Sequence, residues 1–65
     1  ELNHLRYFFE VAKAGSFTAA ARQLRISQSA LSKSVALLEA AEGIKLLQRS
    51  KKGVTLTSLG QEVFR

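Results

Sequence analysis

Apolar residues recur at three- and four-residue intervals near the start of the chain, which is the signature of an amphipathic helix. The members of this apolar set are Leu2, Leu5, Phe8, Phe9 and Ala12, and charged residues stand between them. The spacing predicts a helix over about residues 2–14 with this set facing the core. A glycine commonly follows the last turn of a helix, so Gly15 is expected to end it.

A second, shorter helix is predicted directly after this glycine. Ser16 is a favourable N-cap, and the helix is expected over residues 17–24. Alanines at positions 19–21 make one side of this helix thin, so another helix can approach it closely. Arg25 and Ile26 are expected to form the turn that follows.

The third helix is predicted to begin after the N-cap Ser27 and to run to about Glu42, where Gly43 stops it. Successive residues are about 100° apart around a helix, so its residues separate into two faces. Leu31, Val35 and Leu38 form the apolar face. The opposite face carries Ser29, Lys33, Ala36 and Ala40, with Gln28 and Ser32 on one flank.

Two short strand-like runs come next, at residues 46–50 and 54–57, around the sequence Lys51-Lys52-Gly53. A glycine in a three-residue connection is a typical hairpin signal. We therefore predict a β-hairpin with a basic tip.

Thr57 or Ser58 is expected to cap a last helix, and Ser58 with Gln61 matches a capping box. The complete pattern is three helices, a hairpin and the start of a fourth helix. It predicts a mainly α fold, a winged helix-turn-helix over residues 1–57, followed by the start of a linker helix at 58–65. The chain begins without Met, so we expect it to be part of a longer protein.

Charge is segregated along this small basic chain of 65 residues, whose net charge is +5. Residues 11–38 and 43–61 contain Lys and Arg but no carboxylate. A helix that enters a DNA groove lies among phosphates, which would repel carboxylates. Double-stranded DNA is therefore the expected partner. Taken alone, the basic charge is also compatible with a solvated surface that has no nucleic-acid partner.

Enzymatic and membrane functions find little support. The chain has no Asp and no Cys, and its only histidine, His4, stands among Leu and Phe residues without an evident nucleophile to activate. We expect no catalysis, no bound metal and no cofactor in this domain. No apolar run approaches about 20 residues, and charges interrupt the N-terminal segment, so neither a membrane span nor a signal peptide is predicted. A cytoplasmic location is expected, since the lack of cysteine fits a reducing compartment.

Candidate DNA contacts lie on the third helix and the hairpin. Gln28 can pair with adenine, the hydroxyls of Ser29 and Ser32 can bond phosphates or bases, and Lys33 can reach a phosphate or a guanine. In the hairpin, Arg49, Lys51 and Lys52 can grip phosphates or enter the minor groove. For both sets of residues, the alternative interpretation is an ordinary polar surface that faces solvent and contacts no DNA. The aromatic residues Phe8, Phe9 and Phe17 are expected in the core rather than stacked on bases, because they recur at helical spacing.

Several motifs together resemble the DNA-binding domain of LysR-type transcriptional regulators. They are GSFTAAA at 15–21, L-x-I-S-Q-x-A-L-S at 24–32, LE at 38–39, G at 43, LLQRS at 46–50 and LTxxG at 56–60. The resemblance covers nearly the whole chain. It implies a bacterial regulator that dimerises through a longer linker helix and binds a small-molecule effector in a separate domain.

The resemblance also implies roles for individual residues. Gln28, Ser29, Ser32 and Lys33 fall where the family's third helix meets the major groove, and Thr18 falls where the second helix touches the DNA backbone. The basic wing residues are Arg49, Lys51 and Lys52. Ser29 stands where the family usually has Pro. Unlike Pro, serine keeps its backbone N–H group and adds a hydroxyl. Lys33 replaces the usual Arg and lacks its planar fork, so we expect a phosphate contact there.

A protein–protein interaction module with the same winged-helix fold is the main alternative function. Such a module has no physical need to keep residues 11–38 and 43–61 free of carboxylates. The acid-free segments therefore favour the DNA-binding interpretation.

Overall fold

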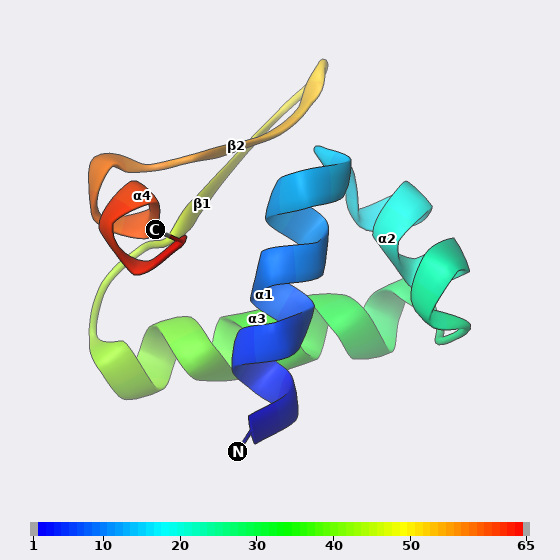
Figure 1. Cartoon of the computed structure of the whole chain (residues 1–65), viewed down its shortest axis with the longest axis horizontal. Coiled ribbons are helices and arrows are strands. Elements are labelled where there is room, and N and C mark those ends of the chain that lie inside the picture. Colours follow the sequence, from blue (N-terminus) through cyan, green and yellow to red (C-terminus); the bar gives the residue numbers. More distant parts are fainter. Residues whose placement is uncertain (1, 65) are drawn as a thin grey trace.

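The computed structural model describes residues 2–64, and it confirms a mainly helical winged helix-turn-helix. The elements in chain order are α1 (Leu2–Ala14), α2 (Phe17–Leu24), α3 (Gln28–Glu42), β1 (Leu47–Ser50), β2 (Gly53–Leu56) and α4 (Ser58–Phe64). α1 crosses over α3, α2 lies beside them, and the hairpin of β1 and β2 extends away from the helices (Figure 1). α4 lies near the base of the hairpin.

The helix ends form at the predicted capping residues. The Ser16 hydroxyl accepts a hydrogen bond from the amide of Ala19 at 3.1 Å, and the Ser27 hydroxyl accepts one from Ala30 at 3.1 Å. Gly43 closes α3 in a left-handed conformation, and its amide donates to the Glu39 carbonyl at 2.8 Å. Each cap satisfies backbone groups that a helix end leaves without a partner.

The turn between α2 and α3 consists of Arg25 and Ile26, as the sequence predicts. Arg25 has φ 60° and ψ 42°, a left-handed conformation that disfavours residues with a Cβ atom. The amide of Ile26 donates to the Ala21 carbonyl at 3.1 Å, and the half-buried Ile26 side chain packs against the core. The turn is therefore held by a backbone hydrogen bond and by apolar packing.

The core draws on the first three helices and the start of the hairpin. Its buried apolar members are Phe8, Val11, Phe17, Ala20, Ala21, Leu31, Val35, Leu46 and Leu47. The predicted inner face of α3 is confirmed, since Leu31 and Val35 are buried and Leu38 is half-buried. The buried Ala20 and Ala21 confirm that the thin side of α2 packs closely.

The predicted inner face of α1 is partly wrong. Val11, which is not in the predicted apolar set, is fully buried, whereas Leu5 is 40% exposed. The buried face is centred on Phe8 and Val11, three residues apart, so Leu5 falls at its edge. The side chain of Leu2 lies outside the part of the chain that the structure describes.

The hairpin is one residue tighter than the sequence pattern predicts. Ser50 pairs with Gly53 and Leu47 with Leu56, which leaves Lys51-Lys52 as a two-residue turn. Gly53 therefore belongs to β2 and not to the connection. Its φ of 128° is one that residues with side chains rarely adopt, and a Cβ atom there would lie 2.6 Å from the Gly15 carbonyl oxygen.

Two backbone anchors hold the hairpin on the helices. The amide of Val54 donates to the Gly15 carbonyl at 3.0 Å, which ties β2 to the turn between α1 and α2. At the other end, one carboxylate oxygen of Glu39 accepts from the amides of Leu46 at 2.8 Å and Leu47 at 3.1 Å. The Glu39 carboxylate thus provides a hydrogen-bond acceptor for two amides at the start of β1, and it fixes that strand to α3.

α4 is capped by Thr57, one of the two residues that the sequence offered. The Thr57 hydroxyl accepts from the amide of Gly60 at 3.0 Å and donates to the Lys45 carbonyl at 2.7 Å. The predicted capping box of Ser58 and Gln61 is wrong, because with Thr57 as the N-cap the third helical residue is Gly60. The domain boundary at residue 57 stays a prediction, and Arg65 lies outside the described residues.

Gly60→Ala is expected to lower the free energy of unfolding by about 1–3 kcal/mol, the usual cost of overpacking. Gly60 is buried, and a Cβ atom on it would lie 2.9 Å from the carbonyl carbon of Leu46 and closer still to its oxygen. At a helix position with space for a Cβ atom, the same substitution raises the free energy of unfolding. Urea unfolding measures the effect, and Ser58→Ala, at an exposed position of the same helix, is the control. A Gly60→Ala protein more stable than the parent would contradict the close packing of α4 on Leu46.

Candidate nucleic-acid interface

The N-terminal half of α3 presents its predicted polar residues to solvent. Gln28, Ser29 and Lys33 are exposed, and Ser32 is half-buried. Ser29 and Lys33 lie on the side of α3 opposite Leu31 and Val35, which hold the helix against the core. The rigid packing of one face thus fixes where the polar face points.

A hollow joins the start of α2, the start of α3 and the hairpin. Four of the predicted contact residues line it, namely Thr18, Gln28, Arg49 and Lys51. Its remaining lining residues are apolar or neutral, and none carries a carboxylate. Ser29, Ser32, Lys33 and Lys52 lie outside this lining, so the structure gathers half of the predicted set around one hollow.

Gln28 is oriented by α2. The Thr18 hydroxyl donates a hydrogen bond to the Gln28 side-chain oxygen at 3.1 Å, across the helix-turn-helix. That oxygen keeps a second lone pair, and the side-chain NH2 group keeps both donors. Gln28 can therefore still offer the donor and acceptor pair that recognises adenine. Thr18, expected at the DNA backbone, has this additional contact.

Arg49 lies on β1 and turns toward the helices. Its guanidinium carbon is 3.9 Å from the centre of the Phe17 ring, and one of its NH2 groups donates a hydrogen bond to the Ser32 hydroxyl. Both contacts connect the hairpin to the helix-turn-helix. Stacking on an aromatic face is a favourable arrangement for a guanidinium.

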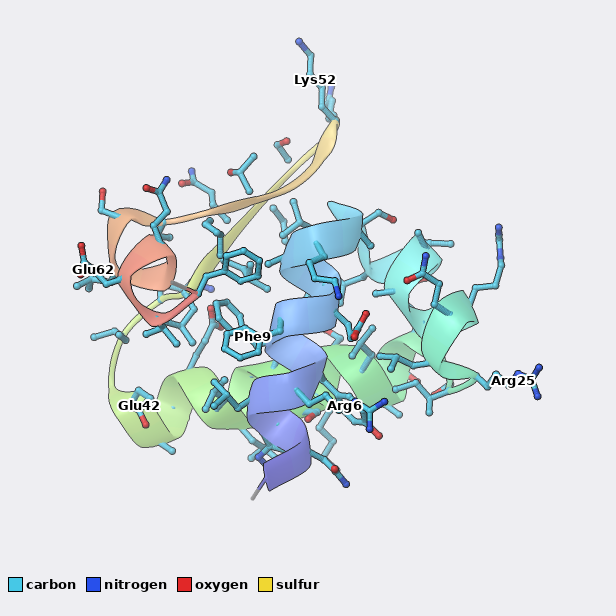
Figure 2. All side chains as sticks on the ribbon, in the orientation of Figure 1. Arg6, Phe9, Arg25, Glu42, Lys52 and Glu62 are labelled. Atoms are coloured by element: carbon cyan, nitrogen blue, oxygen red, sulfur yellow. The ribbon has the colours of Figure 1, made fainter. Side chains whose placement is uncertain are left out.

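Lys51 and Lys52 form the hairpin tip, and both are exposed. Figure 2 shows Lys52 extending from the tip away from the helices. The amide of Lys52 donates to the Ser50 hydroxyl at 3.3 Å, so the backbone of the tip is ordered while the two ammonium groups face solvent. The tip can thus supply positive charge to a partner beyond the globular core.

The sequence pattern does not reveal the parts played by Phe17 and Glu39. Phe17 is 5% exposed and belongs to the core as expected, but one face of its ring also supports Arg49. Glu39 has a structural task at the start of β1. The available signal for Glu39 was that it is one of two acids, with Glu42, between the basic segments, whereas nothing local to Phe17 pointed to Arg49.

Two other kinds of site are absent from residues 2–64. No helix there has the length and apolar character needed to cross a membrane. No three His, Cys, Asp or Glu side chains of this range gather in a way that could hold a metal ion.

The fold and this surface define a winged helix-turn-helix domain whose third helix begins with exposed amide and hydroxyl side chains. Residues 2–61 match the model of the family described as bacterial regulatory helix-turn-helix protein, lysR family. The chain belongs to this LysR family, which confirms the resemblance noted from its motifs.

Curated relatives are transcriptional regulators by name. The Hca operon transcriptional activator HcaR of Escherichia coli is 49% identical over 61 residues, which are 94% of this chain and 21% of HcaR. The regulator PtxR of Pseudomonas aeruginosa is 49% identical over 63 residues, 97% of this chain and 20% of PtxR. The chain thus spans about a fifth of the length of these relatives.

Solved structures of DNA complexes share the fold. The complex of the CbnR DNA-binding domain with DNA superposes with a TM-score of 0.94 at 41% identity, covering 98% of this chain and 74% of that one. The BenM DNA-binding domain with catB site 1 DNA gives 0.94 at 44% identity, covering 98% and 71%. The chain is therefore a LysR-type helix-turn-helix DNA-binding domain.

Proposed function

We propose that this domain binds double-stranded DNA in a sequence-dependent way, with α3 in the major groove and the hairpin as a wing against the backbone or the minor groove. The observation that carries the proposal is that Thr18, Gln28, Arg49 and Lys51, from α2, α3 and the hairpin, line one hollow whose lining has no carboxylate. Phosphates approach such a surface without repulsion, and its lysine and arginine side chains release counterions from the DNA.

Base and backbone contacts are expected from different parts of this surface. Gln28 and Ser29 begin α3, and the first residues of a recognition helix are those that usually reach base edges. Lys33, Lys51 and Lys52 supply point charges that suit phosphates, and Thr18 lies at the start of α2, beside the expected path of the backbone. The DNA complexes of the CbnR and BenM domains support this docking.

The proposal extends to the full-length protein. We propose that the full-length protein is a cytoplasmic transcriptional regulator, not an enzyme, whose linker helix begins near Ser58 and pairs two copies. A separate domain would bind the small-molecule effector. The DNA-binding domain itself needs no cofactor for the contacts described. Support comes from the family and from relatives about five times as long as this chain.

DNA binding by the isolated domain is expected to be weak and strongly dependent on salt. A single small module has few contacts, so a non-specific Kd of about 10⁻⁴–10⁻⁶ M is expected at physiological salt. If about four phosphates are neutralised, the slope of log K against log salt is about −3 to −4 and affinity falls roughly a hundredfold between about 50 and 200 mM salt. Fluorescence anisotropy with a mixed-sequence duplex measures both quantities.

Arg6→Ala is the matched control for this titration. It removes one positive charge from the exposed side of α1, far from the hairpin tip (Figure 2), and is expected to leave the slope nearly unchanged. Binding that is indifferent to salt, or no binding at low salt, would contradict the DNA-binding proposal. Either result would favour the protein–protein interaction module instead.

A further inference from the structure

We propose that Ser32 and Phe17 act on DNA through Arg49, as positioning residues that hold its guanidinium in the place where it meets a phosphate. The inference rests on the proposed function, and it reassigns Ser32 from a direct contact of α3 to a support for the wing. It concerns three residues from three elements, which are α2, α3 and β1.

The backbone beneath Arg49 is fixed on both sides. Arg49 pairs with Val54 across the hairpin, and the Val54 amide donates to the Gly15 carbonyl at 3.0 Å. Two residues before Arg49, the buried Leu47 has its amide paired with the Glu39 carboxylate at 3.1 Å. The strand that carries Arg49 is therefore tied to the helices before and after this residue.

The side chain is held by two contacts of different kinds. Phe17 is 5% exposed and packs in the core, and the centre of its ring lies 3.9 Å from the guanidinium carbon. The Ser32 hydroxyl accepts one N–H of the same guanidinium. A guanidinium has five N–H donors, so four remain for a ligand, and its planar fork suits the two oxygens of a phosphate.

Holding this arginine in advance should raise its affinity for a phosphate. A free arginine side chain loses rotamer freedom when it binds, and that loss weakens binding. In this structure stacking and hydrogen bonding already restrict the side chain before DNA arrives. The expected gain in affinity is about two- to tenfold, the range set by immobilising one long side chain.

A double-mutant cycle on DNA binding tests the inference. The domain, Ser32→Ala, Arg49→Ala and the double variant are titrated with the same mixed-sequence duplex over a salt series. Ser32→Ala is expected to weaken binding about two- to tenfold while leaving the salt slope unchanged, because no charge is lost. Arg49→Ala is expected to weaken binding further and to reduce the slope by about one. In the Arg49→Ala background, Ser32→Ala should cause no additional loss.

Two further variants separate positioning from simple structural damage. Ser32→Thr keeps the accepting hydroxyl and should bind like the parent. Phe17→Leu keeps an apolar side chain but removes the ring face, so it should weaken binding only while Arg49 is present. Thermal unfolding of each variant gives the folded fraction, by which its affinity is corrected.

The outcomes are distinct from a failure of the proposed function. If the parent domain binds DNA with a steep salt slope and the Ser32→Ala loss persists without Arg49, Ser32 contacts DNA itself and the inference is wrong. It is equally wrong if Ser32→Ala binds as tightly as the parent. If the parent domain does not bind the duplex at all, the proposed function fails and the inference fails with it.

Discussion

Leu31→Ala is expected to lower the free energy of unfolding by about 2–5 kcal/mol, the range for truncating a fully buried leucine. Leu31 is 0% exposed and lies with Val35 on the face of α3 that packs into the core. Removing its branched end loses apolar burial and leaves a cavity that the surrounding helices fill only in part. A domain of this length has a total stability of about 3–10 kcal/mol, so the variant loses a large share of it.

Urea unfolding followed by circular dichroism gives the comparison, and Leu37→Ala is the matched control. Leu37 lies on the same helix and undergoes the same chemical change, but it is 49% exposed. A surface change of this kind usually shifts stability by no more than about 0.5 kcal/mol. Equal unfolding midpoints for the two variants would mean that the inner face of α3 has been assigned wrongly.

The local signals in the sequence proved reliable because their physical causes are local. Ser16 and Ser27 cap helices by bonding amides three residues ahead, and Gly43 closes α3 through its own backbone conformation. Such features depend on neighbouring residues alone, so chain order reveals them. The turn of Arg25 and Ile26 was predictable for the same reason, although Arg25 takes a conformation that favours glycine.

Features that depend on the packing of distant segments were not predictable. The inner face of α1 centres on Val11 because of where α2 and α3 pack, and periodicity alone does not reveal that placement. The docking of β2 on the helices depends on the bond between Val54 and Gly15, which lie far apart in sequence. The choice of Thr57 rather than Ser58 as the cap of α4 belongs with its bond to Lys45, again a tertiary contact.

The candidate interface shows the same division. Residue types and charge segregation pointed to Gln28, Lys33 and the hairpin lysines, because an acid-free surface is visible in the sequence itself. The contact of Arg49 with Phe17 joins residues 32 positions apart, and the bond between Thr18 and Gln28 crosses the helix-turn-helix turn. These pairings decide how the side chains are oriented, and only the folded chain brings them together. The direct role of each residue in DNA binding stays a prediction.

Gln28→Ala and Lys52→Ala are expected to weaken DNA binding in two different ways. Gln28 lies at the start of α3, and its amide is oriented by Thr18, so it is placed to read a base edge. Its removal should cost about 1–3 kcal/mol on the preferred site and little on other sequences, which relaxes base preference at one or two positions. Lys52 at the hairpin tip supplies charge without a directional fork. Its removal should weaken binding to all sequences similarly and reduce the salt slope by about one.

The comparison needs two duplexes and a salt series. One duplex is selected by the parent domain from a randomised pool, and the other is a scrambled sequence of the same composition. Arg6→Ala, which removes a charge from α1 far from the hairpin tip (Figure 2), serves as the control for loss of charge. If Gln28→Ala weakens both duplexes equally, α3 does not read bases through this residue. If Lys52→Ala changes neither the affinities nor the slope, the tip of the hairpin does not contact DNA through this residue.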